Sequence, residues 1–317
     1  MIFYIVDAFA EKPYGGNTAG VVLIKDGYDF PEDRWMLKIA AELRFSETAF
    51  VRQDPDGNFT TRYFTPRYEV DLCGHATIAA FGLMWEEDIV PGGETFINHT
   101  AAGDLKVIPG STVMMQMAAP RLVGTIEDTP TIDCLLKAMR MIPGVLLPLP
   151  IEIISTGLPD ILLPVSDPSS LFCLNPDMDA LSKLSESLGV VGVHAFAPVL
   201  PTWKTDAEAT SDLYERFLKV GISAYKYVFG AGSPISVRNF APLYGIPEEP
   251  ATGTANAALT YYLYRNGLMV DGSGRTFEQG NAMGRPSIVE TRLDIVDGQP
   301  DIWVGGPCAI VAKGELL

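Results

Sequence analysis

The pattern of apolar and polar positions predicts a chain built mostly of strands. In the first third of the chain, short apolar or alternating runs predict strands at residues 1–6, 19–25, 48–52 and 59–64. Alternation across residues 96–119 predicts an antiparallel pair. Later runs predict strands at residues 151–154, 161–165, 193–198, 287–295, 301–304 and 308–313.

The same pattern predicts four main helices. Residues 178–188 form one. Residues 32–45 form another, for which we expect a buried face of Trp35, Leu37, Ile39, Ala40 and Leu43. The segment 74–85 is apolar almost all round, and 255–266 matches it. A helix that is apolar on every side belongs inside a domain.

One motif occurs twice, more than half the chain apart. Residues 62–68 return as residues 238–244, with Arg, Phe, Pro and Tyr in the same places. Each copy runs through a short acidic stretch to a glycine, Gly74 or Gly253, that opens one of the two apolar helices. This spacing predicts two similar halves that face each other, and ligand sites favour such interfaces.

We therefore predict two α+β domains, 1–121 and 122–317, each with a mostly antiparallel sheet around a central helix. The last strands are allowed to cross back to the first domain. The Pro-rich stretch 120–150 is the predicted linker.

Composition narrows the class of protein. The chain has 317 residues, 47% of them apolar, but its longest apolar run is too short for a membrane span. The N-terminus reads as a buried strand without the marks of a signal peptide, so we expect a cytoplasmic protein. The net charge of −16 argues against nucleic acid and anionic membranes as partners.

No metal or nucleotide cofactor is expected. The four cysteines are widely spaced, which predicts free thiols, and none of the three histidines shows metal-ligand spacing. Motifs that bind nucleotide phosphates are also absent from the sequence.

His75 and Cys73 flank the predicted start of the first apolar helix. A helix N-terminus suits an anion, and a histidine there could bind or protonate a substrate. The alternative is a histidine that only caps the helix. The helix would lower the pKa of the Cys73 thiol, although a small buried cysteine is the simpler interpretation of that position.

Three acidic residues are candidates for acid/base chemistry. Glu47 lies between a helix and an apolar strand, where burial would raise its pKa and suit it to proton transfer; a capping or surface role is the alternative. Glu248 and Glu249 precede Gly253, and either could be an acidic partner or part of a solvated turn. Thr254 corresponds to His75 in the repeat, and it could hold a carboxylate.

A series of motifs resembles the PhzF-like phenazine-biosynthesis isomerase family. These motifs are at residues 6–9, 16–21, 46–51, 62–66, 73–77, 155–157, 249–255, 279–280 and 284–287. They fall in order over nearly the whole chain. The resemblance implies a diaminopimelate-epimerase-like fold with the active site between two domains. It also implies an isomerase without a metal or organic cofactor, often a homodimer.

The resemblance also implies roles for individual residues. Glu47 would carry the proton, with His75 assisting and Glu249 as the acidic partner. The predicted substrate-binding residues are Asn17, Ser46, Cys73, Gly74, Gly253 and Thr254.

Two departures from the family pattern lie in the predicted site. The family's usual Asp is Glu249 here, and its usual Ser is Thr254. We therefore expect a small carboxylated metabolite rather than one named substrate. Two other functions remain open: an epimerase or racemase of an amino or hydroxy acid, and a metabolite-binding protein without catalysis.

Overall fold

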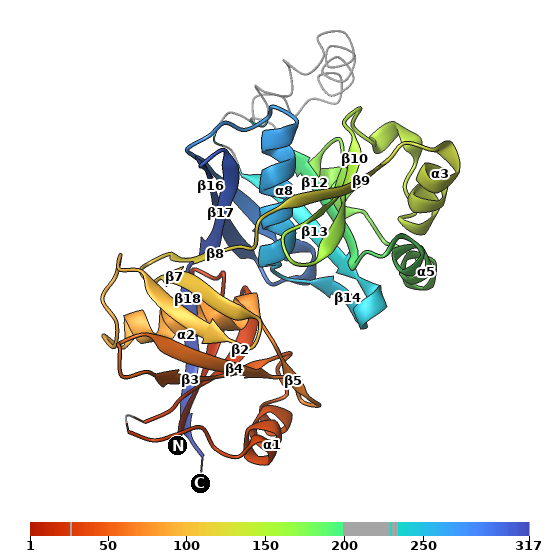
Figure 1. Cartoon of the computed structure of the whole chain (residues 1–317). Coiled ribbons are helices and arrows are strands. Elements are labelled where there is room, and N and C mark those ends of the chain that lie inside the picture. The colour runs from red at the N-terminus through yellow and green to blue at the C-terminus, as the bar shows by residue number, and fades with distance from the viewer. Residues whose placement is uncertain (26, 199–228, 230–231, 233, 317) are drawn as a thin grey trace.

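Each half of the chain wraps strands around one central helix. Figure 1 shows the computed structural model, which describes residues 1–25, 27–198, 229, 232 and 234–316. The central helices are α2 (Gly74–Glu86) and α8 (Gly253–Arg265). All residues of α2 from 76 to 84 are buried, as expected for a helix that is apolar on every side.

The first half contains eight strands and the surface helix α1 (Asp33–Leu43). The strands are β1 (Ile2–Ala8), β2 (Asn17–Leu23), β3 (Thr48–Gln53), β4 (Phe59–Phe64), β5 (Glu69–Val70), β6 (Phe96–Thr100), β7 (Gly103–Ile108) and β8 (Val113–Gln116). All the strands predicted in this region are present.

The described part of the second half adds more strands and its own surface helices. The strands are β9 (Arg121–Ile126), β10 (Ile151–Ser155), β11 (Pro159–Pro164), β12 (Gly192–Pro198), β13 (Ile235–Ala241), β14 (Ile246–Glu249), β15 (Ser273–Gln279), β16 (Ser287–Val296), β17 (Gln299–Gly306) and β18 (Cys308–Glu315). The helices besides α8 are α3 (Thr129–Ala138), α4 (Pro168–Phe172) and α5 (Met178–Leu188), with short 3₁₀ turns η1 (Pro143–Val145), η3 (Pro242–Tyr244) and η4 (Asn281–Met283).

The two halves repeat one series of strand pairings. β1–β2 is antiparallel, β2–β3 parallel, β3–β4 antiparallel, β4–β6 parallel, and β6–β7 and β7–β8 are antiparallel. The pairs β10–β11, β11–β12, β12–β13, β13–β15, β15–β16 and β16–β17 follow the same series. The repeat in the sequence is therefore also a repeat of topology.

Further pairings tie the halves together. β18 returns to the first half and lies antiparallel to β1, so that the two chain ends are neighbours (Figure 1). β8 of the first half pairs with β17 of the second, whereas β9 pairs with β10 within the second half. Because strands of the two halves pair with each other, strand pairing does not mark a domain boundary. The division of the chain into two domains, 1–121 and 122–317, stays a prediction.

The repeated arginine has the same structural role in both halves. Arg62 on β4 donates two hydrogen bonds to Glu69 on β5, at 2.7 and 2.6 Å. Arg238 on β13 donates two to Glu248 on β14, both at 2.8 Å. Each guanidinium also lies over the ring of the phenylalanine two residues further along. Such bidentate pairs fix an arginine firmly, and here each one holds a short edge strand.

Two expectations about packing were wrong. On α1, Trp35 is 49% exposed, and its neighbour Met36 is buried instead. Residues 120–150 are not a linker, because β9 pairs with β10 and α3 buries Leu135 in the core of the second half.

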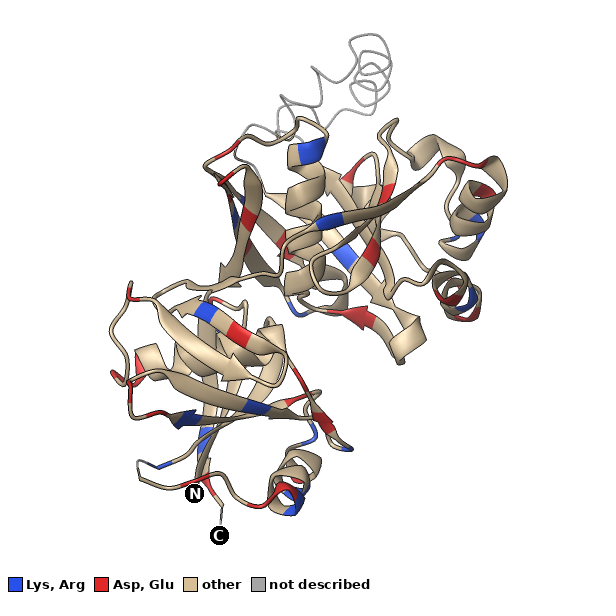
Figure 2. Ribbon diagram, in the orientation of Figure 1, with Lys and Arg blue, Asp and Glu red and all other residues tan. Residues whose placement is uncertain are grey.

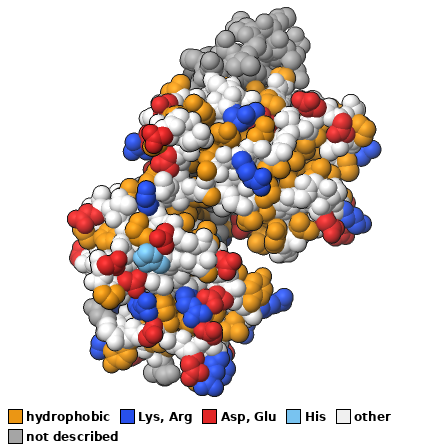
Figure 3. All heavy atoms as spheres, in the orientation of Figure 1, with side chains coloured by type: hydrophobic (Ala, Val, Ile, Leu, Met, Phe, Trp, Pro, Cys, Tyr) orange, Lys and Arg blue, Asp and Glu red, His pale blue; other side chains and the backbone are white. Residues whose placement is uncertain are grey.

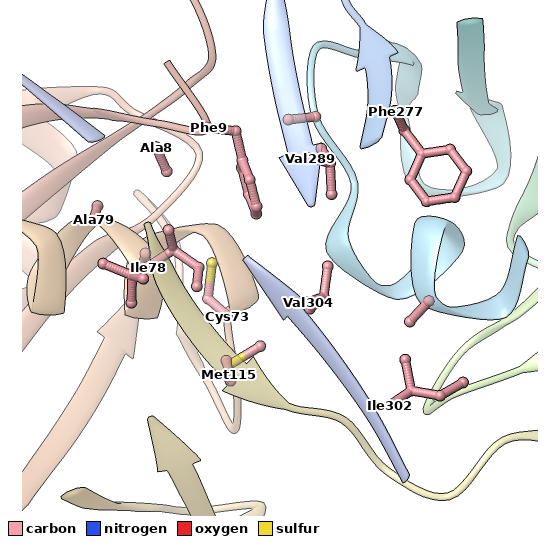
Figure 4. Close-up of a cluster of buried hydrophobic side chains, with 14 of the residues drawn as sticks. Ala8, Phe9, Cys73, Ile78, Ala79, Met115, Phe277, Val289, Ile302 and Val304 are labelled. Carbon is pink, nitrogen blue, oxygen red and sulfur yellow. The ribbon is translucent and has the colours of Figure 1, made fainter. Parts of the chain in front are cut away.

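Figure 4 shows the region where the halves share one apolar core. Phe9, directly after β1, belongs to the same buried cluster as Ile78 on α2 and Val304 on β17. A Cβ on Gly253 would meet both Val304 and the Phe9 ring, at 3.5 and 3.8 Å. This packing brings the starts of α2 and α8 into one region, and the two helices contact each other.

Charged residues lie mainly on outer strands and loops, whereas the central helices are nearly free of them (Figure 2). On the face drawn in Figure 3, the basic side chains are scattered among acidic ones. The surface visible there has no continuous basic area of the kind that nucleic acid recognition uses.

Candidate active site

Three of the predicted residues meet at the start of α2. Ser46 and Glu47 occupy the short connection between α1 and β3, and His75 is the second residue of α2. His75 Nε2 lies 3.3 Å from Ser46 Oγ and 3.4 Å from Glu47 Oε2. The Gly20 N–H donates to the Glu47 carbonyl at 3.2 Å, which fixes the backbone at this point.

The Glu47 and His75 side chains are shielded but can be reached from solvent. Their exposed fractions are 21% for Glu47 and 11% for His75. Burial lowers the pKa of His75, and the charge of Glu47 only partly opposes this effect. The imidazole is therefore neutral near pH 7, so one ring nitrogen can accept a proton and the other can donate one.

Cys73 stands at the N-cap of α2 and completes this group. Its Sγ is 3.4 Å from His75 Nδ1 and 3.8 Å from His75 Nε2. Burial raises the pKa of the Cys73 thiol well above its usual range, and the nearby charge of Glu47 raises it further. The expected lowering of this pKa by the helix was therefore wrong, because desolvation outweighs the helix field.

The second half contributes Glu249. Its Oε2 accepts a hydrogen bond from the Thr252 hydroxyl at 2.6 Å. Burial raises its pKa to about 7; the Thr252 hydrogen bond opposes that shift, and the charge of Glu47 adds to it. Glu248 is committed to Arg238. Of the two adjacent acids, Glu249 is thus the one available for chemistry.

A buried amide holds the loop that carries Glu249. Gln279 Nε2 donates to the Glu249 carbonyl at 2.9 Å, and Gln279 Oε1 accepts from the Thr252 N–H at 3.1 Å. Asn256 on α8 donates to the same Gln279 oxygen at 2.9 Å. These bonds fix the strand-to-helix turn, so the position of Glu249 is set before any ligand arrives.

Sequence reasoning missed a second buried acid, Asp160. It lies on β11 with 2% of its surface exposed, and its Oδ1 has no hydrogen-bond partner. Burial raises its pKa to about 7, and the charge of Glu249 contributes. The available signal was a lone acid in the otherwise apolar run at residues 158–165.

The acids of the two halves lie within electrostatic reach of each other. The charge of Glu47 raises the pKa of Glu249, and the charge of Glu249 raises those of Cys73 and Asp160. Asn17 bridges the halves directly, because its side-chain amide donates to the Ala251 carbonyl at 3.1 Å. These groups therefore make up one candidate site, to which both halves contribute.

Two helix N-termini open at this site. α2 starts at Gly74 and α8 at Gly253, and neither has a side-chain cap. The first N–H groups of a helix have no partner within it, and they suit an anion such as a carboxylate. The Thr156 hydroxyl donates to the Thr254 carbonyl at 2.9 Å, which fixes the first turn of α8.

Comparisons with known proteins identify the family. The profile of the phenazine biosynthesis-like protein family matches residues 6–314. The chain belongs to this family. An uncharacterized isomerase of Deinococcus radiodurans is 33% identical over 98% of this chain and 92% of its own length. The chain is accordingly an enzyme of the isomerase class.

Solved structures agree on the fold. A phenazine biosynthesis protein of the PhzF family from Bacillus anthracis superposes with a TM-score of 0.80 at 24% identity, covering 100% of this chain and 99% of that one. A probable proline racemase from Agrobacterium radiobacter K84 superposes with a TM-score of 0.56 at 12% identity, covering 100% and 92%. The predicted fold class is confirmed.

Some motifs that resemble the family have a structural role here. Arg285 donates to Asp7 Oδ1 at 2.9 Å, to the Gly16 carbonyl at 2.9 Å and to the Thr18 hydroxyl at 2.7 Å. Asp7 is buried, and burial strengthens such a pair. The motifs around residues 7, 16–18 and 285 therefore join the halves beside the site.

The other histidines lie outside the site. His194 on β12 is buried between Asn239 and Asn256, at 3.2 and 3.3 Å, and burial lowers its pKa to about 3. His99 is on the surface, where Asp104 lies 2.7 Å away and raises its pKa. Of the three histidines, only His75 lies beside Glu47.

Among the described residues, no helix is both long enough and apolar enough to cross a membrane.

Proposed function

We propose that this enzyme is a cofactor-independent isomerase that moves a proton between two carbons of a small carboxylated metabolite. The reaction would be similar to that of trans-2,3-dihydro-3-hydroxyanthranilate isomerase. The observation that carries the proposal is the 3.4 Å approach of Glu47 to the neutral His75, with the buried acid Glu249 within electrostatic reach of Glu47.

Glu47 is the proposed proton carrier. Its carboxylate removes a proton from an acidic C–H, and the bonding electrons move into the adjacent unsaturated system. The protonated Glu47 then returns the same proton to another carbon, so the product is an isomer and nothing is consumed. A positioned acid/base contributes roughly 10²–10⁴-fold to the rate.

The remaining residues are proposed to hold the substrate. His75, with Ser46 and Cys73 around it, orients the reacting part. Glu249, protonated near neutrality, donates a hydrogen bond to a substrate oxygen or nitrogen. The N–H groups at Gly74, Gly253 and Thr254 receive the carboxylate. We propose Asn17 as a further substrate-binding residue at the edge of the site.

The test is absorbance-monitored incubation with trans-2,3-dihydro-3-hydroxyanthranilate, followed by a library of small unsaturated acids. Glu47→Gln serves as the inactive variant, and Glu42→Gln on the exposed side of α1 is the matched control. Turnover by the wild type and the control, but not by Glu47→Gln, supports the proposal. Equal turnover by all three refutes the role of Glu47.

An epimerase of an amino or hydroxy acid is the second candidate. Glu47 and Glu249 approach from opposite halves, and an epimerase needs acid/base groups on opposite faces of one carbon. Cys73 with Glu249 is another such pair. Loss of optical rotation with deuterium entering the α-carbon in D₂O would favour this reaction, whereas a shifted double bond favours the isomerase.

We also propose that the protein is a cytoplasmic homodimer and that each chain has two domains, 1–121 and 122–317. Analytical ultracentrifugation at micromolar concentration should give twice the mass of the 34.4 kDa chain. A single species with the mass of one chain would contradict the dimer.

A further inference from the structure

Four polar side chains are buried next to the loop that carries Glu249. They are His194 on β12, Asn239 on β13, Asn256 on α8 and Gln279 on β15, and each is at most 1% exposed. His194 pairs with Asn239 across the sheet, and Asn239 pairs with Glu249. Residues that lie opposite each other on antiparallel strands point to the same face, so these three side chains share one face of the sheet. Because buried polar groups need hydrogen-bond partners, few arrangements of these side chains are possible.

Backbone groups fix the orientation of two of the amides. The Thr252 N–H can only donate, so the Gln279 atom that accepts from it at 3.1 Å is the carbonyl oxygen Oε1. The Thr252 carbonyl can only accept, and Asn256 donates to it through Nδ2 at 2.9 Å. Asn256 therefore turns its oxygen, Oδ1, toward His194. Turning either amide over would set two donors or two acceptors against each other.

This orientation determines the tautomer of His194. Asn256 Oδ1 lies 3.3 Å from His194 Nε2 and can only accept, so Nε2 carries a hydrogen. Burial lowers the pKa of His194 to about 3, so the ring is neutral and Nδ1 carries none. Nδ1 accordingly accepts from the Asn239 amide at 3.2 Å. The hydrogen bonds therefore run in one direction, from Asn239 through His194 to Asn256.

The chain of hydrogen bonds ends on one oxygen of Glu249. Asn256 Nδ2 also donates to Gln279 Oε1 at 2.9 Å, and Gln279 Nε2 donates to the Thr252 hydroxyl at 3.0 Å. Because the hydroxyl accepts this bond, its own hydrogen is free to bind Glu249 Oε2, 2.6 Å away. The hydroxyl thus occupies Oε2, and Oε1 is the oxygen of Glu249 that the chain leaves free.

We propose that His194 is a positioning residue for Glu249. Acting through the two amides of Asn256 and Gln279, it keeps the Thr252 hydroxyl donating to one carboxyl oxygen. The other oxygen, Oε1, is then the one that presents a proton to the substrate. The direction of the chain rests on the contacts alone, whereas the role of Oε1 in turnover rests on the proposed function.

The tautomer can be measured in the unmodified full chain. Nitrogen-15 NMR distinguishes a ring nitrogen that carries a hydrogen from one that does not, and the signals that disappear in His194→Gln belong to His194. We expect a hydrogen on His194 Nε2 and none on Nδ1, without change between about pH 5 and 9. The surface histidine His99 should titrate in the same spectra and serves as the internal control. A hydrogen on His194 Nδ1, or a charged His194 ring at neutral pH, overturns the proposal.

Two substitutions of similar size separate positioning from packing. His194→Gln keeps an N–H that can donate to Asn256, whereas His194→Leu fills the space without a donor. In the folded leucine variant, checked by circular dichroism, the Thr252 hydroxyl should be held less firmly on Glu249. Loss of that bond should raise the pKa of Glu249 above its wild-type value of about 7, and His194→Gln should leave this pKa near the wild-type value.

The same pKa of Glu249 in the wild type and in folded His194→Leu overturns the role of His194. A raised value in both variants also overturns it, because the glutamine variant retains the donor. Should the leucine variant not fold, the tautomer of His194 in the wild type decides the direction of the chain.

Turnover has a separate readout. Once a substrate is found, His194→Leu should lower kcat about tenfold with a smaller change in KM, because the proton donor is displaced. His194→Gln should restore most of the lost kcat. The NMR measurements need no substrate, so they stand or fall independently of the proposed function. An unchanged kcat in a leucine variant whose Glu249 pKa has shifted refutes Glu249 as the proton donor.

Discussion

The two halves of the molecule share a scaffold and differ in chemistry. Both repeat one series of strand pairings, both place a glycine at the start of a buried helix, and both hold an edge strand with an arginine–glutamate pair. To the candidate site the first half adds a histidine, His75, and a partly exposed acid, Glu47. The second half adds the buried acids Asp160 and Glu249, which lie in a network of side-chain amides.

Equivalent positions show how the difference arises. Thr48 pairs with Phe64, and Val193 pairs with Phe240, the matching phenylalanine of the repeated motif. On their other sides Thr48 pairs with Gly20 and Val193 with Ile161. Glu47 therefore corresponds to Gly192, and Asp160 corresponds to Ala19.

The other acid follows the same rule. Val70 pairs with Tyr63, and Glu249 pairs with Asn239, at matching places in the repeated motif. Glu249 thus corresponds to Val70. Each acid of the site has a partner in the other half that cannot ionise. The comparison suggests that the repeated residues maintain the fold, while the chemistry lies where the repeat is broken.

The largest expected effect comes from removing Glu47, the acid that the first half contributes to the site. Glu47→Gln should lower kcat by at least about two orders of magnitude, because an amide cannot accept the proton. Its urea-unfolding midpoint should match that of Glu42→Gln, which makes the same change on the surface. A kcat within threefold of the control contradicts a catalytic Glu47.

The repeated arginines should affect stability unequally. Arg238 is 8% exposed and also donates to three backbone carbonyls, so Arg238→Ala should cost about 3–5 kcal/mol. The Arg62 side chain is 25% exposed, and its second partner, Asp33, lies at the surface; Arg62→Ala should cost about 1 kcal/mol. Urea unfolding measures the free energy of unfolding of both variants. Equal losses in the two variants would mean that burial does not make one arginine–glutamate pair contribute more than the other.

Asp160→Asn should change how stability depends on pH. The folded pKa of about 7 lies above the ordinary value of 3.8, so the contribution of Asp160 to stability should fall as pH rises from about 4 to 7. The asparagine variant lacks this loss, and its stability relative to the wild type should rise over that window by on the order of 4 kcal/mol. The matched control is Asp133→Asn on the surface of α3. A difference that stays constant with pH contradicts the buried carboxyl.

The smallest effect concerns the basic limb of the activity profile. If Glu249 works in its protonated form, kcat/KM should fall above about pH 7, where the carboxyl ionises. Glu249→Gln keeps a hydrogen-bond donor without that titration, so its profile should stay flat through pH 9, with a maximum about tenfold lower. An unchanged basic limb in the variant assigns the titration to another group.

Much of the site could be predicted because its parts lie near one another in the sequence. Cys73, Gly74 and His75 share one helix start, and the apolar character of the following residues placed that helix inside the half. Glu47 precedes an apolar strand, so its place beside the core was also visible.

Other parts of the candidate site depend on contacts that the spacing of residues along the sequence does not reveal. The roles of Glu248 and Glu249 separate because neighbouring residues on a strand point to opposite faces, and only the fold shows which face meets Arg238. Asp160 became a candidate because the fold buries it within electrostatic reach of Glu249. The proline-rich stretch 120–150 was wrongly predicted to be a linker, because prolines also occur at the starts of helices. One proline begins the 3₁₀ turn η1, and another, Pro130, lies in the first turn of α3.

The most direct test of the account is an NMR titration of the Glu249 carboxyl in the wild type and in Glu47→Gln. If the two halves build one site, the pKa of Glu249 should be about 7 in the wild type and should fall when the charge at residue 47 is removed. A wild-type value near the ordinary 4.5, or one unchanged by Glu47→Gln, would contradict a shared proton-transfer site.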